Sequence, residues 1–305
     1  MRFSFWPWLS KSWDELSGLV AHVEATGWDG VYVADHFMAD DGGGFGAVTD
    51  PLLEATATVA ALAGETSRVR LGTLVLGMTY RHPAVLANWA ATVDHASGGR
   101  LLLGVGAGWQ QNEHDQYGIA LGSVRQRIDR FEEGVQVIAG LHGHPVTSLA
   151  GRHYALVDAI CEPKPVQNPV PLLIGAKGDR MLGIVARYAT AWNMWSTPDQ
   201  NRERFAVVAR HCEAIGRDPV QVSRSTQAIV IVSDSDSFEN ERAIAEGLAP
   251  RPVLVGTPTR IAEQVVAYAD AGVDELIVPD FALGVGAQRT DRLDALIEEL
   301  APLRS

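Results

Sequence analysis

Short apolar runs alternate with helix-like segments along the whole chain, and this alternation restricts the possible folds more than any other feature of the sequence. The apolar runs cover residues 2–6, 30–34, 69–76, 101–105, 171–175, 191–195, 222–232 and 274–279. Apolar residues recur at helical spacing in the segments 13–27, 51–65, 83–97, 123–138, 179–189, 202–215, 237–247, 257–272 and 291–300. Strands that alternate with helices form parallel sheets, so the pattern predicts an α/β fold, a closed (β/α)8 TIM barrel formed by one domain over residues 1–305. An open, doubly wound sheet is the alternative, although it usually contains fewer units.

Local signals predict where several helices begin. Two pairs have the spacing of a capping box, Ser12 with Glu15 and Ser123 with Gln126. Asp50 and Pro51 have the form of a helix cap followed by a first-turn proline, which predicts a helix from there to about residue 65. Helical spacing disappears between residues 142 and 167, where glycines and prolines predict an inserted hairpin and loop.

Composition excludes several classes of partner. The net charge of −12 argues against a nucleic-acid partner. The two cysteines, Cys161 and Cys212, are too few for a disulfide framework and do not have the spacing of a metal site. The first residues, MRFSFWPWLS, resemble neither a signal peptide nor a membrane span. We therefore expect a cytoplasmic protein that binds no membrane and no metal.

The stretch 98–118 carries the densest set of candidate site residues. The apolar run 101–105 is followed by Gly106 and Gly108 and then by a polar and aromatic cluster at 109–114. Glycines at the carboxyl end of a buried strand allow a ligand to approach the backbone, and barrels place their active sites at this end. A tight turn with a solvated loop is the alternative. A dinucleotide fingerprint is disfavoured, because the motif lies in mid-chain and no acidic residue follows at the required distance.

Other predicted strand ends add polar and aromatic residues. His36 follows Asp35 after the second strand and is the strongest candidate for acid–base chemistry, with a packed core histidine as the alternative. The loop GAKGDR, residues 175–180, combines small residues with two cations before a helix, as in an anion-binding loop, although an ordinary polar turn explains it equally well. Four tryptophans fall at strand ends and suit a flat ligand or the core: Trp6, Trp8, Trp109 and Trp195. No nucleophile elbow or P-loop is present, which favours a bound cofactor.

Four stretches together resemble the bacterial luciferase-like family of flavin and deazaflavin oxidoreductases. They are GWDGVYVADHF, VRLGTLVLGMTYRHPAVLANWAATVDHASGGRLLLGVGAGW, PKPVQNPVPLLIGAKGDR and GTPTRIAEQVVAYADAGVDELIV. The resemblance is strongest to the branch that uses coenzyme F420, an 8-hydroxy-5-deazaflavin, with the FMN monooxygenases as close relatives. It implies a barrel with loop insertions that binds the cofactor ring at its carboxyl end.

The resemblance also implies a set of site residues. Asp35 and His36 would contact the ring and carry the catalysis, with His36 near the atom that transfers hydride. A bulge at Thr73, Leu74 and Val75, with a non-proline cis peptide as an option, would support one ring face. The remaining cofactor contacts implied are Gly106, Ala107, Gly108 and Asn112 at the ring edge, and Gly175, Ala176, Lys177, Gly178 and Arg180 at the phosphate.

We therefore expect a deazaflavin-dependent oxidoreductase that transfers hydride between coenzyme F420 and a small organic substrate. An FMN monooxygenase that uses oxygen and reduced flavin is the first alternative, and a non-catalytic flavin-binding barrel is the second. The chain departs from the sugar-phosphate dehydrogenases of the branch, which carry Glu where it has Trp109 and Trp where it has Asp40. Their substrate and acid–base pair are therefore not transferred. A homodimer is an assembly that these features allow.

Overall fold

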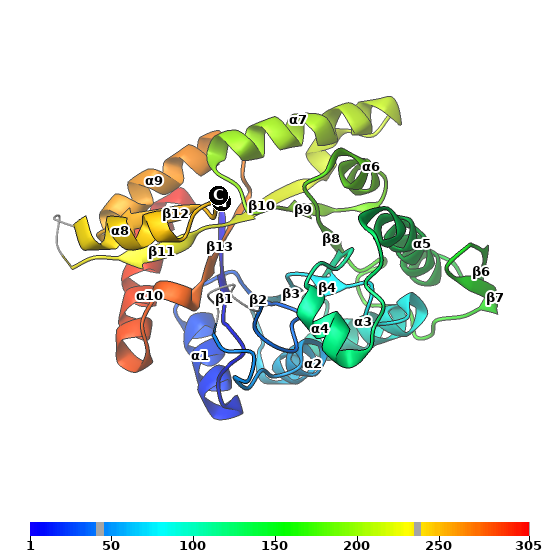
Figure 1. The fold of residues 1–305 in the computed structure, drawn as a ribbon, viewed down its shortest axis with the longest axis horizontal. Coiled ribbons are helices and arrows are strands. Elements are labelled where there is room, and N and C mark those ends of the chain that lie inside the picture. The colour runs from blue at the N-terminus through cyan, green and yellow to red at the C-terminus, as the bar shows by residue number, and fades with distance from the viewer. Residues whose placement is uncertain (41–45, 235–238, 305) are drawn as a thin grey trace.

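The chain folds into a closed barrel of parallel strands surrounded by helices (Figure 1). The structure is a computed structural model that describes residues 1–40, 46–234 and 239–304. Within these ranges the barrel strands are β1 (Arg2–Trp6), β2 (Gly30–Val33), β3 (Arg70–Thr73), β5 (Leu101–Gly106), β8 (Leu172–Gly175), β9 (Ala191–Asn193), β10 (Ser223–Gln227) and β13 (Glu275–Pro279). Each pairs in parallel with its neighbours, and the pairing of β3 with β5 closes the sheet. The predicted TIM barrel is thus confirmed.

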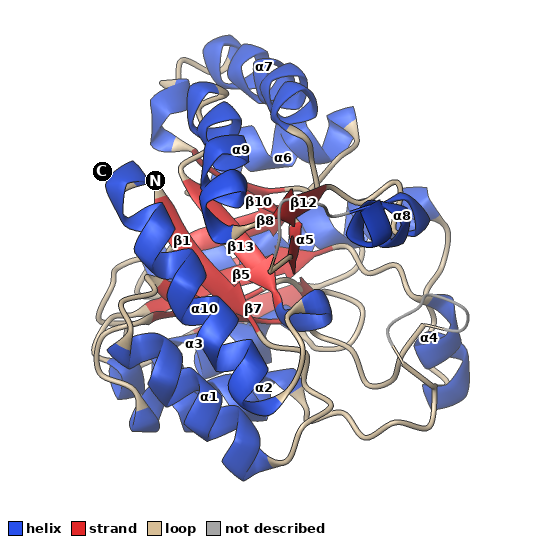
Figure 2. Ribbon diagram, turned by 90° about the vertical axis from the view of Figure 1, so that its left-hand side faces the viewer, coloured by secondary structure: helices blue, strands red, loops and turns tan. Residues whose placement is uncertain are grey.

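Helices cover the outside of the barrel, with the strands inside them (Figure 2). They are α1 (Trp13–Ala25), α2 (Ala55–Glu65), α3 (Pro83–Ser97), α5 (Val124–Gly143), α6 (Asp179–Tyr188), α7 (Pro198–Ala214), α9 (Pro258–Asp270) and α10 (Gly286–Leu300). The side chain of Ser12 accepts the amide of Glu15 at the start of α1, and Ser123 and Gln126 form a complete capping box at α5. Both predicted helix starts are therefore confirmed.

The predicted start of the second helix at Pro51 is wrong. Helix α2 begins at Ala55, because the carboxylate of Glu54 accepts the amide of Ala57 and caps it. The Asp50 carboxylate instead accepts the amide of Ala47 at 2.7 Å and closes a local turn. Helices α7 and α10 also begin earlier than expected, at Pro198 and Gly286.

Several elements lie outside the regular repeat. The predicted hairpin is present as β6 (Thr147–Ala150) and β7 (Ala155–Ala159). The predicted single strand 222–232 is wrong beyond Gln227, because β11 (Ile229–Val232) leaves the barrel to pair with β12 (Val253–Gly256). Helix α8 (Glu239–Gly247) matches the expected segment 237–247, whose first two residues lie outside the described ranges. Helix α4 (Gln111–Tyr117) lies at the carboxyl-terminal end of the strands (Figure 2).

A small apolar cluster fills the barrel interior. Its buried members are Trp6, Tyr32, Ala34, Leu74, Leu102, Leu173, Ala191 and Ile277. Glycine is required at two strand positions beside it. A Cβ at Gly72 would lie 2.2 Å from the Tyr32 ring, and one at Gly104 would lie 1.7 Å from the carbonyl oxygen of Thr73. The barrel is therefore a packed core that supports the residues at its carboxyl end.

None of the helices in the described ranges is both long and apolar enough to cross a membrane. Across the same ranges, no cluster of His, Cys, Asp or Glu side chains has the arrangement of a metal site. Cys161 and Cys212 are both buried free thiols.

Candidate active site

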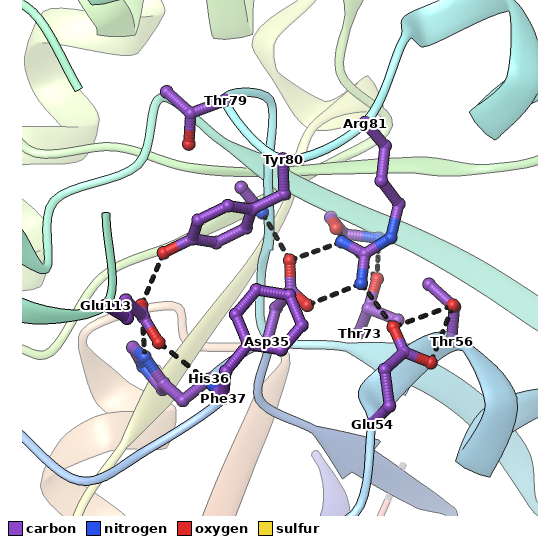
Figure 3. Close-up of polar contacts among 12 residues, drawn as sticks. Asp35, His36, Phe37, Glu54, Thr56, Thr73, Thr79, Tyr80, Arg81 and Glu113 are labelled. Atoms are coloured by element: carbon purple, nitrogen blue, oxygen red, sulfur yellow. Dashed lines mark hydrogen bonds and ion pairs between the residues drawn. The ribbon is translucent and has the colours of Figure 1, made fainter. Parts of the chain in front are cut away.

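His36 pairs with a buried carboxylate at the carboxyl end of the barrel. It follows β2, and its Nδ1 lies 3.1 Å from Oε1 of Glu113 (Figure 3). Glu113 belongs to α4, directly after the glycine run of β5, and is only 1% exposed. The sequence placed Glu113 in a polar cluster but gave no signal for this pairing, because the two residues are 77 positions apart.

Hydrogen bonds from His36, Tyr80 and Phe37 hold Glu113 in its ionised form. The hydroxyl of Tyr80 donates a short hydrogen bond to Oε1, and the amide of Phe37 donates to Oε2 at 2.9 Å. Burial alone would raise the pKa of Glu113, but the hydrogen bonds and the charge of His36 outweigh burial and lower it below 4.5. Burial and the same carboxylate raise the pKa of Tyr80, so its hydroxyl stays protonated. Because an ionised carboxylate only accepts, Nδ1 of His36 carries a hydrogen, and Nε2 is the atom that can exchange a proton.

Aromatic rings surround His36. Its ring centroid lies 5.5 Å from that of Trp109 and 6.2 Å from that of Trp8. Phe281 contacts both Trp8 and Trp6, and Trp6 in turn lies 5.8 Å from Trp195. The four tryptophans singled out in the sequence therefore lie in one linked aromatic set. This set gives the histidine an apolar surrounding on two sides, while Trp109 remains 59% exposed.

Asp35 points away from His36 and toward Arg81 (Figure 3). Its two oxygens accept hydrogen bonds from Nη1 and Nη2 of Arg81 at 2.7 and 2.9 Å, and one also accepts the amide of Gly77 at 2.8 Å. Arg81 continues to Glu54 at the start of α2 through a second, short contact. The carboxylate thus connects β2 with β4 (Leu76–Gly77) and, through Arg81 and Glu54, with the start of α2.

The segment Thr73–Val75 forms an irregular joint between β3 and β4. The Thr73 hydroxyl accepts a hydrogen bond from the amide of Gly104 at 2.8 Å. It also donates one to the carbonyl of Gly104 at 2.7 Å. The peptide bond between Leu74 and Val75 is cis, the option that the resemblance implied. The predicted bulge is therefore present as an interruption between β3 and β4.

Val75 lies against two glycines of the predicted ligand site. A Cβ at Gly106 would lie 2.7 Å from a methyl group of Val75, and a Cβ at Gly175 would lie 3.0 Å from it. The structure therefore brings together Val75 from the joint before β4, Gly106 from β5 and Gly175 from β8. Glycine is needed at positions 106 and 175 partly because the Val75 side chain occupies the space that a Cβ would take.

The ring-edge candidates follow β5. The Nδ2 of Asn112 donates to the carbonyl of Ala39 at 2.9 Å, while its buried Oδ1 has no partner within the described ranges. Gly108 adopts a φ of 82°, and a Cβ there would lie 2.7 Å from the Thr79 hydroxyl. Ala107 is half-buried against the core. Asn112 therefore offers a buried acceptor that a ligand donor could satisfy.

The loop 175–180 leads into the first turn of α6. Gly178 is its N-cap and supplies no side-chain hydrogen bond, so the first amides of the helix are left for a ligand or solvent. The indole of Trp192 donates to the carbonyl of Ala176 at 2.8 Å and fixes the loop from below. Lys177 is exposed and makes no ion pair with any described residue. Arg180 differs, because Asp129 and Glu132 on α5 both lie within ion-pair distance of it.

Comparison with known proteins agrees with this architecture. The family model described as luciferase-like monooxygenase matches residues 3–249. The chain belongs to the luciferase-like monooxygenase family. It is 29% identical over 297 residues to an F420-dependent glucose-6-phosphate dehydrogenase of Kineococcus radiotolerans, covering 86% of each chain. It is 28% identical to the pyrimidine monooxygenase RutA of Yersinia enterocolitica, covering 79% of this chain and 67% of that protein.

A solved structure shares the whole fold. The F420-dependent secondary alcohol dehydrogenase in complex with an F420–acetone adduct superposes with a TM-score of 0.84 over 98% of both chains, at 18% identity. Because the two sequences are only 18% identical, the likeness bears on the fold alone. The chemistry of the site follows from the residues of this chain.

We expect Glu113→Gln to reduce the loss of stability in acid. Because the folded pKa of Glu113 is depressed, its ionised form contributes stability that is fully present above about pH 4.5 and is lost as the pH falls through the folded pKa. The wild-type free energy of unfolding should therefore fall more steeply than that of Glu113→Gln as the pH is lowered below about 4.5. Urea unfolding at a series of pH values measures both slopes. Equal slopes would show that Glu113 has no depressed pKa in the folded protein.

Proposed function

We propose that this protein binds coenzyme F420 and transfers hydride between it and a small organic substrate. The observation that carries the proposal is the His36–Glu113 pair at the carboxyl end of the barrel. A bound deazaflavin supplies two-electron hydride chemistry and does not activate oxygen. The names of the F420-dependent relatives support this cofactor.

The residues present fit such a cofactor. The pyrimidine edge of a deazaflavin carries an N–H donor, and Oδ1 of Asn112, four residues after Gly108, is a buried acceptor without a partner among the described residues. A ribityl phosphate fits the uncapped start of α6, with Lys177 as the available cation. Gly106, Ala107 and Gly108 would line the ring edge, and Gly175, Ala176 and Gly178 the phosphate. Arg180 would act on the cofactor more weakly, because Asp129 and Glu132 already offset its charge.

The protein's own residues would manage the proton. Hydride transfer to a carbonyl or from an alcohol requires one proton to be delivered or removed at oxygen. His36 can do this through Nε2, while Glu113 accepts from Nδ1 and orients the ring. Tyr80 and the Phe37 amide hold Glu113 in place, so they are positioning groups. Asp35 would act through Arg81 and Gly77, by fixing the backbone that faces the cofactor.

An FMN monooxygenase is the second candidate, because the family includes the pyrimidine monooxygenase relative. Titration of the purified protein with each cofactor, followed by ring fluorescence, separates the two. Saturable binding of F420 at lower concentration than FMN supports our proposal, and the reverse order supports the monooxygenase. Turnover with any acceptor excludes a non-catalytic flavin-binding barrel.

We propose that the substrate is a small organic molecule, and because Trp109 stands where the sugar-phosphate dehydrogenases of the branch carry Glu, their substrate is not transferred to this chain. A cytoplasmic location fits the free thiols of Cys161 and Cys212, since thiols stay reduced there.

A homodimer is proposed as the assembly, and light scattering of the purified protein tests it.

We expect Lys177→Gln to weaken F420 more than FMN. Both cofactors carry a phosphate, but only F420 continues into a tail with several carboxylates. One exposed charge pair at contact contributes about 1 kcal/mol, or about fivefold in affinity. The difference between the cofactors should shrink as salt rises.

Arg180→Gln is the matched control, because it removes the same charge from the same loop but from a group already paired with α5. We expect a smaller loss of F420 affinity in this variant. Fluorescence titrations at low and high salt give all the dissociation constants. Equal weakening of both cofactors by Lys177→Gln would mean that the tail does not contact this lysine.

A further inference from the structure

A cavity lies at the opposite end of the barrel from His36. Its volume is about 270 Å³, and residues at or just before the starts of β1, β3, β5, β9 and β10 line it. Its polar lining residues include Arg2, Arg70, Arg100, Gln167, Thr190 and Ser223. Both chain termini lie at this end (Figure 2). The volume is just below the range of about 300–1,000 Å³ of typical ligand sites, so a small metabolite fits it.

Two of the three arginines share one carboxylate. Nε and Nη2 of Arg2 both lie 3.4 Å from Oε2 of Glu275, and Nη2 of Arg70 lies 3.5 Å from the same oxygen. The other oxygen, Oε1, accepts the hydroxyls of Ser4 at 2.6 Å and Tyr32 at 3.0 Å. Glu275 therefore balances only one of the two positive charges, through contacts longer than the usual charge-assisted hydrogen bond.

The nearest additional carboxylate does not remove this surplus. Asp29 lowers the energy of the charged form of Arg70, but its carboxylate also lies 3.6 Å from Arg304 and accepts the amide of Phe3. One positive charge at Arg2 and Arg70 is thus left without a dedicated partner.

Arg100 adds a further positive charge. Its guanidinium donates five hydrogen bonds, all to neutral oxygens: the carbonyls of Ser97, Ala63, Thr66 and Val69 and the hydroxyl of Thr66. No carboxylate of the described residues lies within ion-pair distance of it. The group is therefore a rigid charge in the wall of the cavity, and Glu24 stabilises its charged form only from beyond ion-pair distance.

Donors also remain available in the cavity. Nη1 of Arg2 has no acceptor among the described side chains and carbonyls, whereas Arg70 also hydrogen-bonds the Tyr32 hydroxyl. The Ser223 hydroxyl accepts from Arg2 at 3.1 Å, which leaves its own hydrogen to donate. In a protein of net charge −12, a cavity with surplus positive charge and free donors is selective for anions.

We propose that this cavity binds a compact dianion, inorganic phosphate or a small phosphomonoester, between Arg2 and Arg70 and beside Arg100. The guanidinium fork suits phosphate oxygens, and the fixed charge of Arg100 favours the second negative charge. Such a ligand connects the starts of β1 and β3. It therefore stabilises the closed barrel by mass action, independently of the cofactor at the other end.

The test compares inorganic phosphate with sodium chloride at equal ionic strength, by calorimetric titration and by the midpoint of thermal unfolding. We expect saturable binding of phosphate and a higher midpoint than in chloride. Arg70→Gln should weaken phosphate by about tenfold or more, as the loss of a charge-assisted contact predicts. Arg70→Lys keeps the charge that faces Glu275 and should give an intermediate affinity, which provides a folded variant if the glutamine variant unfolds.

Lys177→Gln is the matched control, because the start of α6 could also hold phosphate. Phosphate binding that persists in Lys177→Gln and is weakened in the Arg70 variants supports the proposal. Binding lost in Lys177→Gln and unchanged in Arg70→Lys places the ion at the cofactor loop and overturns it. A response to phosphate equal to that of chloride overturns it as well. Titration of a small phosphomonoester, such as glycerol phosphate, then distinguishes the free ion from an esterified ligand.

Discussion

His36→Ala is expected to lower kcat by about 10²–10⁴-fold while it changes the dissociation constant of the cofactor far less. The reason is that Nε2 of His36 is the proposed proton donor or acceptor, whereas most cofactor contacts are proposed to come from the glycine run, Asn112 and the start of α6. A substrate is first identified by oxidation of reduced F420 against a panel of carbonyl compounds. Steady-state kinetics and fluorescence titration then give kcat and the dissociation constant separately.

Two further variants sharpen this result. Glu113→Gln keeps the shape of the side chain but removes the carboxylate that accepts from Nδ1 and orients His36, so kcat should fall here too. His22→Ala removes a partly exposed histidine on α1 that pairs with Asp294, and it should leave kcat unchanged. If His36→Ala weakens cofactor binding and turnover equally, His36 is a structural contact of the ring and not the proton carrier.

The barrel could be predicted from the sequence because its signals are local. Buried strands appear as continuous apolar runs, and caps such as Ser12 and Ser123 depend on residues three positions apart. The prediction failed where distant contacts decide. Asp50 and Pro51 have a helix-start pattern, but Asp50 closes a turn with Ala47, and the amide of Leu53 instead donates to Leu9. The run 222–232 is apolar enough for one strand, and only its distant partner β12 explains why the chain leaves the barrel after Gln227.

The candidate site was predictable to a similar extent. His36 and the glycine run were found because residues at carboxyl ends of barrel strands face the site. Glu113 and Tyr80 were not singled out, because their pairing joins segments 33 positions apart and has no sequence pattern. Asp35 was expected beside His36, since the two are adjacent in sequence. Successive side chains near a strand end point in different directions, and this geometry turns Asp35 toward Arg81 instead.

Asp35→Asn is expected to lower the free energy of unfolding by about 3 kcal/mol, near the lower end of the range for breaking a buried ion pair. Asp35 is 3% exposed and accepts both a two-fold hydrogen bond from Arg81 and the amide of Gly77. Asparagine can accept at one position only, and it leaves the half-buried guanidinium without its main counter-charge. Because Glu54 still contacts Arg81, we do not expect the full cost of an isolated buried charge.

Glu54→Gln is the matched control, because it removes a carboxylate from the other side of the same guanidinium. The Glu54 side chain is 36% exposed, so this change should cost about 1 kcal/mol or less. A double-mutant cycle of Asp35→Asn with Arg81→Met isolates the pair, and the double variant should lose less stability than the sum of the single variants. Urea unfolding of the four proteins measures the coupling. Additive losses, or an equal cost for the two carboxylates, would mean that Asp35 does not hold Arg81 as a buried pair, and that the backbone at Gly77 is fixed by other contacts.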